Sequence, residues 1–366
     1  MSPRRILFTV PNLEGGGAER VMVTLISHLD RSRFTPLLAL VDVRGTYLKD
    51  LPDDVAVTGL GGRGPLAFLR LLRLIRREKP DTVFCSVTFY NTLVLLLKPL
   101  APAGTRFVVR ENTVPQEHLP NMPYGWLRAW LYPIAHRLAD VVICQSAEMA
   151  DAVARFGVPE RLLAELPNPV DTDRIDNLAA APAPFSGAGR HLVAAGRLVP
   201  QKGFDMLLSA FARVCAQRDD VTLHLLGEGP ERENLTRQVA ELGLEAQVRF
   251  EGFQENPFPW YRAADLFVQS SRYEGFPNVV LEALACGTPA VTFAYPGGTP
   301  VVDGVNGWRV PAGDIEAFAG RVIEALAAPL PEPRAVAFSI DRHRVEVVTE
   351  RFQAVLTPEP AEPPKT

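Results

Sequence analysis

The feature that most constrains the fold of this chain is a regular alternation of short apolar stretches with longer segments of helical character. The apolar stretches are four to six residues long and rich in Val, Leu, Ile and Phe. Short buried strands that alternate with helices are typical of a doubly wound parallel sheet. We expect strands at 6–10, 37–41, 55–60, 82–86, 106–110 and 141–144, and in a second series at 191–196, 222–227, 248–252, 266–269 and 290–293.

Two domains are expected because a stretch of linker composition divides the two series of strands. Residues 179–189 consist of Ala, Pro, Ser, Gly and one Phe, a composition typical of connecting segments. The length of 366 residues also suits two ordinary domains. We predict an α/β fold with two Rossmann-like domains, at 1–178 and 190–329. A helix within 335–357 is expected to pack back toward the first domain, and the Pro-rich tail at 358–366 is expected to be disordered.

The composition argues against several classes of protein. A hydrophobic content of 47%, a charged content of 22% and a net charge of −4 describe an ordinary globular protein and disfavour nucleic acid as a partner. The four cysteines are scattered, so neither a disulfide framework nor a structural zinc is expected. The first residues lack the apolar region of a signal peptide, and the longest leucine-rich run, 93–97, is too short to span a bilayer. We expect a cytoplasmic protein, or one on the inner face of the cytoplasmic membrane.

The most unusual local pattern is a carboxylate in the middle of an apolar helix. Residues 273–287 begin as a Glu-Gly-Phe-Pro turn and continue as a short helix that ends at Gly287. Glu282 is the only charged residue between Asn278 and Gly287, and buried carboxylates are rare without a compensating partner. Glu274 lies eight residues earlier, at the helix start, where free backbone N–H groups favour an anion. Glu282 therefore either pairs with a cation inside the protein or contacts a polar ligand.

The loops that follow the strands of the second series carry glycines and cations. Arg197 and Lys202 flank a turn after strand 191–196, and two cations at this edge of a parallel sheet suit a diphosphate. A solvated loop would carry the same residues, so both interpretations stay open here. Gly227 and Gly252 end the next two strands; they can line a nucleobase pocket, although such glycines are common without any ligand.

A glycine loop also follows the first strand. Gly15, Gly16 and Gly17 separate strand 6–10 from a helix, an arrangement that suits backbone contact with phosphate or sugar oxygens. Arg20 stands where a dinucleotide-binding fingerprint requires a third glycine. A nicotinamide-dependent dehydrogenase is therefore the weaker alternative, supported only by an acid, Asp42, after the second strand.

Together these motifs resemble the GT-B glycosyltransferases, and specifically the large retaining family GT4. The resemblance covers nearly the whole chain, and its most specific part is the pair Glu274 and Glu282 within the block 271–289. It implies two parallel-sheet domains that face each other across a cleft. It also implies transfer of a hexose or N-acetylhexosamine from a nucleotide sugar, expected to be UDP-linked, to a glycan or polyprenyl-linked saccharide acceptor on a lipid or cell surface.

The resemblance also implies a role for each motif. Glu282 would hold the ribose hydroxyls, and Glu274 would contact the transferred sugar. Arg197 and Lys202 would neutralise the diphosphate. The expected catalytic residues are therefore these two cations and Glu274. The expected donor-binding residues are Gly16, Gly17, Gly227, Gly252, Phe276, Pro277, Asn278 and Glu282.

No metal or other cofactor is expected. Asp171-Thr172-Asp173 resembles the DxD metal motif of the GT-A glycosyltransferases, but it follows Pro167-Asn168-Pro169. In that position we expect it to form a turn and cap a helix. The nucleotide sugar is then the only small molecule that the reaction needs.

The sequence departs from the family near the reacting sugar. Many members carry a histidine after the strand that corresponds to 106–110, whereas here Glu111 or Asn112 stands at that place and His118 lies a few residues later. All three are candidates for the acceptor side. The segment 295–300 is also shorter than usual, which leaves the choice of sugar open.

Two stretches of the first half suggest an anionic membrane surface as a partner. Residues 63–79 carry six basic residues against one acid, Glu78, and residues 124–132 are rich in Trp and Tyr. An ordinary basic surface helix is the alternative interpretation. Two further functions also stay open: a GT-B epimerase or another non-transferase enzyme with the same donor site, and a non-catalytic protein that binds sugar nucleotides.

Overall fold

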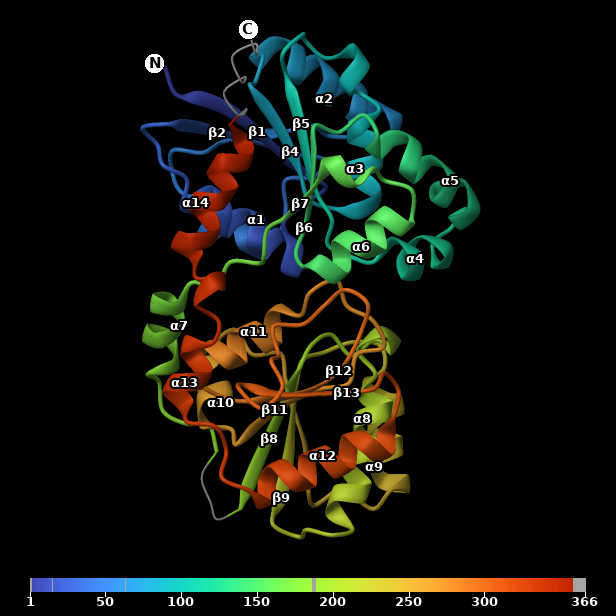
Figure 1. Cartoon of the computed structure of the whole chain (residues 1–366), viewed down its shortest axis with the longest axis vertical. Helices are drawn as coiled ribbons and strands as arrows, with labels where there is room; N and C mark the ends of the chain where they lie inside the picture. Colours follow the sequence, from blue (N-terminus) through green and yellow to red (C-terminus); the bar gives the residue numbers. More distant parts are fainter. Residues whose placement is uncertain (1, 15, 63, 186–188, 358–366) are drawn as a thin grey trace, which may run out of the picture. The chain divides into compact units, whose positions relative to one another are not determined.

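The computed structural model describes residues 2–14, 16–62, 64–185 and 189–357, and it divides the chain into two compact units (Figure 1). Unit 1 consists of Met1–Pro169 together with Val345–Thr366, and unit 2 consists of Val170–Arg344. The chain therefore passes from one unit to the other twice. Each unit is an α/β structure built on its own parallel sheet.

Unit 1 contains a seven-stranded parallel sheet in the order β3-β2-β1-β4-β5-β6-β7. All six strands expected in the first series are present, and β7 is additional. The sequence of β7, Leu-Ala-Glu, gave no signal because it is only three residues long and ends in a charged residue. The strands are β1 (Arg4–Val10), β2 (Phe34–Leu40), β3 (Ala56–Gly59), β4 (Thr82–Cys85), β5 (Arg106–Arg110), β6 (Val141–Cys144) and β7 (Leu163–Glu165).

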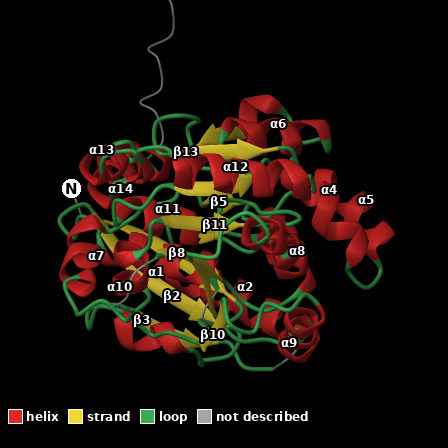
Figure 2. Cartoon of the chain, turned by 90° about the horizontal axis from the view of Figure 1, so that it is seen from below, coloured by secondary structure: helices red, strands yellow, loops and turns green. Residues whose placement is uncertain are grey.

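Helices cover both faces of this sheet (Figures 1 and 2). One face packs under α2 (Pro65–Glu78), α3 (Thr88–Leu95), α5 (Gly125–His136) and α6 (Ala147–Arg155). The other packs under α1 (Gly17–Ser27) and α14 (Val345–Leu356). The remaining helical segments are α4 (Pro115–His118) and the 3₁₀ turns η1 (Thr46–Asp50), η2 (Lys98–Leu100), η3 (Leu119–Asn121) and η4 (Glu160–Leu162).

The last helix of the chain completes the core of unit 1. The Phe352 ring of α14 lies 6.3 Å from that of Phe8 on β1 and 5.0 Å from that of Phe84 on β4, measured between centroids. The side chain of Gln353 accepts a hydrogen bond of 2.9 Å from the backbone N–H of Asp30. The helix is thus fixed by both apolar and polar contacts to residues more than 260 positions earlier.

Unit 2 contains a six-stranded parallel sheet in the order β10-β9-β8-β11-β12-β13. The chain builds outward from β8 first on one side, with β9, and then on the other, with β11. Such a reversal leaves a crevice at the carboxyl ends of the two flanking strands, where open α/β sheets bind ligands. The strands are β8 (Arg190–Ala195), β9 (Val221–Leu226), β10 (Val248–Gly252), β11 (Leu266–Gln269), β12 (Ala290–Phe293) and the unexpected β13 (Gly307–Val310).

The helices of unit 2 also form two layers around two apolar clusters. One face of the sheet packs under α8 (Phe204–Cys215), α9 (Arg232–Glu241) and α12 (Ile315–Ala327). The other packs under α7 (Thr172–Ala179), α10 (Phe258–Ala263), α11 (Asn278–Ala285) and α13 (Pro333–Phe338). Two 3₁₀ turns, η5 (Pro200–Lys202) and η6 (Asp341–His343), complete the unit.

The divisions between the units differ from those expected. Helix α7 falls within the predicted first domain, 1–178, but it belongs to unit 2 because Ile175 and Ala179 are buried in that unit's core. Of the segment expected to return to the first domain, 335–357, only α14 does so. The tail 358–366 and residues 186–188 of the expected linker lie outside the described residues.

His191 on β8 and His224 on the neighbouring strand β9 form a partly buried polar network with Glu251. Nδ1 of His224 lies 2.8 Å from a carboxylate oxygen of Glu251, and its Nε2 lies 3.1 Å from Nδ1 of His191. The Phe185 ring stacks on both imidazoles, with centroids 4.3 and 4.5 Å away. Burial lowers the pKa of His224, which outweighs the opposing effect of Glu251; His191 and Arg249 lower it further.

The lowered pKa of His224 predicts that the protein loses stability in mild acid. The folded state binds a proton at His224 less readily than the unfolded chain, whose histidines titrate near pH 6.5. The free energy of unfolding should therefore fall as the pH drops below about 6.5 and stay level above it. Urea unfolding at about pH 7.5 and 5.5, followed by circular dichroism, tests this expectation. The His224→Gln variant should lose less stability between the two pH values; equal losses would contradict the assignment.

Candidate active site

The predicted site residues of unit 2 meet at the point where its strand order reverses. Arg197 and the turn η5, which ends at Lys202, follow β8. The loop that holds Glu274 follows β11 and leads directly into α11. The two loops are also joined by backbone, because the N–H of Arg272 donates to the carbonyl of Gln201 at 2.8 Å. The structure thus brings together residues that are 72 positions apart.

An ion pair between Lys202 and Glu274 lies at the centre of this group. Nζ of Lys202 is 2.5 Å from Oε1 of Glu274, and the Glu274 side chain is only 8% exposed. Ser271 and Gln269 donate to the same oxygen, at 2.7 and 3.2 Å. The other oxygen, Oε2, accepts no hydrogen bond from the described residues. The carboxylate is therefore held in one orientation with one oxygen available to a ligand.

Tyr295 supports this arrangement from β12's carboxyl end. Its hydroxyl donates to Oε1 of Gln269 at 2.9 Å, which orients the Gln269 amide toward Glu274. Burial raises the pKa of Tyr295, and the nearby Glu274 charge raises it further. The phenol thus remains a protonated donor, and it fixes the second residue that holds the carboxylate.

The two predicted cations differ in how they are held. Lys202 is mostly buried and engaged with Glu274. The Arg197 side chain is exposed and makes no ion pair or hydrogen bond with the described residues. A second arginine, Arg272, fixes the loop instead, through Nη1 and Nη2 to the carboxylate of Asp205 at 2.9 and 2.6 Å. Arg197 is the cation that a dianionic ligand would meet without first displacing a partner.

The start of α11 lies beside this group of residues. Pro277 occupies the N-cap position and has no side chain that could cap the helix, and the first turn carries no acidic residue. Asn278 is the first helical residue, and Glu282 lies one turn further on, where it is buried and has polar contacts of its own. Phe276 is buried, and its ring stacks on that of His343 with centroids 5.4 Å apart. This stacking fixes the loop from which α11 begins.

The glycines at the strand ends have a structural reason of their own. Gly227 has a φ of +137°, and a Cβ added there would lie 1.9 Å from the carbonyl oxygen of Gly196. The N–H of Gly227 donates to the carbonyl of Gly252 at 2.8 Å. Close packing of three adjacent loops therefore requires glycine with or without a ligand. The expected contact of Gly227 and Gly252 with a nucleobase stays a prediction.

The acceptor-side candidates of unit 1 have different surroundings. Glu111 follows β5 and is completely buried; its Oε1 lies 2.8 Å from Nδ2 of Asn91 and 2.9 Å from Nε2 of His136. Asn112 is partly buried, and its Oδ1 accepts a hydrogen bond of 2.7 Å from Thr88. His118 ends α4, and partial burial lowers its pKa. Only Asn112 and His118 are accessible to an acceptor in this structure.

The glycine loop of unit 1 is described in part. Gly16 and Gly17 begin α1, with Gly16 at the N-cap position, while Gly15 lies outside the described residues. Gly16 has no side chain with which to cap α1. The expected contact of Gly16 and Gly17 with the donor phosphates stays a prediction.

Asp171 has the capping role expected of it. Its side chain is the N-cap of α7 and accepts a hydrogen bond of 2.9 Å from the N–H of Arg174. Among the described residues, no group of three His, Cys, Asp or Glu side chains is arranged to hold a metal ion.

None of the described helices has the length and hydrophobicity that a bilayer crossing requires.

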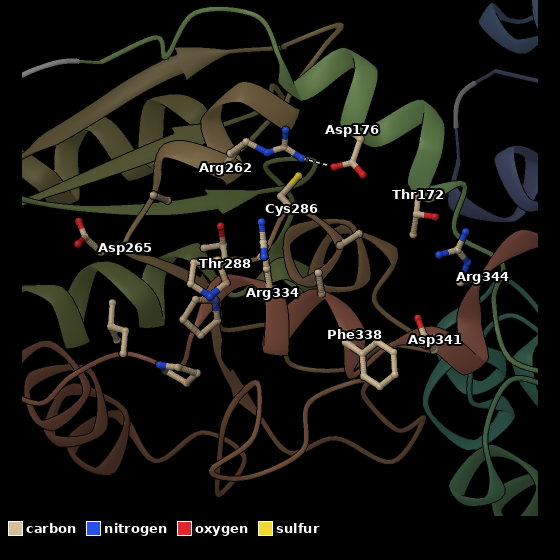
Figure 3. Close-up of a pocket in the computed structure, with 18 of the residues that line it drawn as sticks. Thr172, Asp176, Arg262, Asp265, Cys286, Thr288, Arg334, Phe338, Asp341 and Arg344 are labelled. Atoms are coloured by element: carbon tan, nitrogen blue, oxygen red, sulfur yellow. Dashed lines mark hydrogen bonds and ion pairs between the residues drawn. The ribbon is translucent and has the colours of Figure 1, made fainter.

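A cavity of about 850 Å³ in unit 2 lies away from these residues (Figure 3). It is bordered by Cys286 and Gly287 at the far end of α11, and by Asp265 and Pro289 at the amino ends of β11 and β12. Two of its arginines are already paired, Arg262 with Asp176 and Arg344 with Asp173. None of the predicted site residues lines the cavity. We therefore place the candidate site at the carboxyl ends of the strands, where the predicted residues lie.

Comparisons with known proteins agree with the two-domain arrangement. The family described as Glycosyltransferase Family 4 matches residues 15–174, and the family described as Glycosyl transferases group 1 matches residues 189–328. The lipopolysaccharide core biosynthesis glycosyltransferase LpsE of Rhizobium meliloti is 30% identical over 324 residues, which is 86% of each chain. This chain belongs to the GT4 family of glycosyltransferases.

Two further proteins are similar to this glycosyltransferase, one in sequence and one in structure. A GDP-mannose-dependent phosphatidylinositol monomannoside mannosyltransferase of Mycolicibacterium smegmatis is 33% identical over 287 residues, 72% of each chain. The crystal structure of HepE from Anabaena in complex with UDP superposes with a TM-score of 0.78 over 96% of this chain and 99% of that one, at 20% identity. The fold is therefore GT-B.

Several residues of the site were missed by sequence reasoning. Ser271 could have been found, because it lies three residues before Glu274 in the recognised block. Gln269, Tyr295 and His343 come from segments without a motif, and only the fold brings them to the site. In unit 1, His136 was missed because a single histidine within an apolar helix gives no signal for a buried pair with Glu111.

Proposed function

We propose that this glycosyltransferase transfers a hexose or N-acetylhexosamine from a UDP-linked sugar to a lipid-linked or cell-surface glycan, with retention of the anomeric configuration and without a metal. The observation that carries the proposal is the Lys202–Glu274 pair, which lies beside the start of α11. It supports the proposal because a cation and an oriented carboxylate lie at the carboxyl ends of the unit 2 strands, where open α/β sheets commonly bind ligands.

The donor fits this arrangement in one orientation. The diphosphate would meet Lys202, Arg197 (whose side chain is exposed) and the start of α11, where the helix dipole is positive. Oε2 of Glu274 accepts a hydrogen bond from a hydroxyl of the sugar, and Glu282 on α11 contacts the ribose. The family relationship supports the roles of both glutamates, since they are the two acids of the motif on which the resemblance rests.

The reaction breaks the bond between the anomeric carbon and the diphosphate oxygen and forms one to the acceptor oxygen on the same face. The acceptor's proton passes to the leaving phosphate oxygen, so a nucleoside diphosphate is released and no protein base is needed. Negative charge grows on the diphosphate as the bond breaks. Lys202 and Arg197 stabilise that charge, and Lys202 is already held in place, so little reorganisation opposes the step.

The choice of acceptor rests on the relatives. By their names, one acts in lipopolysaccharide core biosynthesis and another mannosylates a phosphatidylinositol mannoside. Both names describe a transferase, and neither favours the epimerase alternative. Their donors do not settle the nucleotide: one is GDP-dependent by name, and a structural neighbour was crystallised with UDP.

A thermal-shift screen of nucleotides and nucleotide sugars tests the proposal. A ligand that binds only the native state at about 100 times its Kd stabilises the protein by about 2.7 kcal/mol, so the melting temperature should rise clearly with UDP and UDP-sugars. Adenine dinucleotides serve as the negative control. A shift with NAD but none with any nucleoside diphosphate would contradict the donor assignment. If a UDP-sugar binds but is neither transferred to an acceptor nor slowly hydrolysed, the proposed enzymatic activity is contradicted.

A further inference from the structure

We propose that α5 of unit 1 inserts its exposed aromatic face into the surface of an anionic membrane, and that the basic face of α2, on the same side of the unit 1 sheet, adds attraction to the anionic lipid. This goes beyond glycosyl transfer and does not depend on which sugar is moved. It concerns unit 1 alone, and the residues that carry it lie on two helices of one face of the unit 1 sheet.

The side of α5 that faces solvent is apolar. Trp126 is 75% exposed and Trp130 62% exposed, and Ile134 continues the same side of the helix four residues later. Tyr124, directly before the helix, is also 75% exposed. The opposite side packs against α3 and the sheet through Tyr132 and its neighbours. Exposed apolar side chains gathered on one helix face mark an interaction surface rather than ordinary scatter.

The composition around α5 selects a lipid surface. Trp and Tyr are the residues that prefer the boundary between water and lipid. No acidic residue occurs from His118 to Ala139, whereas Arg128 and Arg137 do. A helix with an apolar exposed face and only positive charges suits an anionic bilayer, in whose surface it can lie without crossing the hydrocarbon core.

A basic face lies on α2, which packs on the same side of the sheet as α5, with α3 between the two helices. The exposed side of α2 carries four arginines, and its only acid, Glu78, is already bonded to Arg5 and Arg77. Helix α3 joins the two helices. The ring of Phe68 on α2 lies 5.5 Å from that of Tyr90, and the guanidinium of Arg128 lies 3.8 Å from the ring of Phe89. The arginines are Arg70, Arg73, Arg76 and Arg77.

The two helices should contribute differently to binding. Trp126 and Trp130 supply apolar area, so their effect should not depend on salt. The arginines supply attraction to anionic lipid, which falls off within a Debye length and is weakened by salt. Arg73 is the best single probe, because it is exposed and makes no hydrogen bond or ion pair with the described residues, whereas Arg70 and Arg76 bond to backbone carbonyls.

The experiment is co-sedimentation of the full chain with vesicles of phosphatidylcholine alone or mixed equally with phosphatidylglycerol, without donor or acceptor. Wild type should bind only the anionic vesicles, and less at about 0.5 M than at 0.05 M salt. Trp126→Gln combined with Trp130→Gln should weaken binding more than about tenfold, and Arg73→Gln about fivefold. Phe338→Gln is the matched control, since Phe338 is an equally exposed aromatic residue (73%) on unit 2 and its loss should change nothing.

Three outcomes would overturn the proposal. The first is no binding of wild type to anionic vesicles at low salt. The second is unchanged binding of the double tryptophan variant, whose fold is checked by its melting temperature. The third is a wild-type dimer that the double variant converts to a monomer, which would make this face a contact between copies. Because the vesicles contain no glycan, none of these outcomes bears on the UDP-sugar assignment, which the thermal-shift screen tests separately.

Discussion

Replacing Glu282 with alanine is expected to weaken UDP binding by about 10- to 150-fold. Under the proposed assignment, the change removes a charge-assisted hydrogen bond to the ribose, worth about 1.5–3 kcal/mol. Isothermal titration calorimetry with UDP measures the loss directly. Glu282→Gln keeps the size of the side chain and one acceptor, so its loss of affinity should be smaller than that of the alanine variant.

The control for Glu282 must separate a lost ligand contact from a damaged fold, since Glu282 is buried. Glu111→Gln provides it, because Glu111 is also a buried carboxylate with polar partners, but it lies in unit 1. Both variants should lower the melting temperature, and only the Glu282 variants should lower UDP affinity. Normal UDP affinity of a folded Glu282→Ala protein would show that this carboxylate is structural and that the donor site is wrongly assigned.

Replacing Lys202 with alanine is expected to lower kcat by about 10²- to 10³-fold, the usual cost of losing one preorganised group that stabilises developing charge. The KM for the UDP-sugar should rise much less, because in the proposed mechanism Lys202 acts mainly when the diphosphate gains charge. The same change leaves Glu274 buried without its cation, which should cost about 3 kcal/mol of stability. Steady-state kinetics and urea unfolding measure the two effects.

A double variant separates those two effects of Lys202. In Lys202→Met combined with Glu274→Gln, neither charge remains, so most of the lost stability should return while the transfer rate stays low. Recovery of the rate together with the stability would mean that the pair only holds the loop. A Lys202→Ala enzyme with normal kcat would contradict the proposed role of the lysine outright.

The fold could be predicted largely because each buried strand is local in sequence. Eleven strands could be recognised as short apolar runs, whereas β7 is only three residues long and β13 begins with a glycine, Gly307. The boundary at α7 could not be predicted, since Ile175 and Ala179 would suit the core of either domain. Helix propensity and linker composition say nothing about which core a helix joins.

The site could be predicted as far as it is built from single loops. Glu274 and Glu282 lie within one block, and Arg197 and Lys202 within one turn, so their spacing carries the signal. That Lys202 pairs with Glu274 was not foreseeable, because the pairing depends on two strands lying side by side. Glu111 is a different case: it was a candidate because it stands where many family members carry a histidine, and the sequence did not reveal that the fold buries it completely.

Because α14 supplies Phe352 and Leu356 to unit 1, the core of that unit cannot close until the ribosome has made all of unit 2. Unit 2 is continuous from Val170 to Arg344 and can complete its own core first. Until α14 emerges, the apolar face around Phe8 and Phe84 stays uncovered, the kind of surface on which nascent chains aggregate or meet chaperones. Synthesis thus finishes the second half of this molecule before the first, against the usual direction of folding during translation.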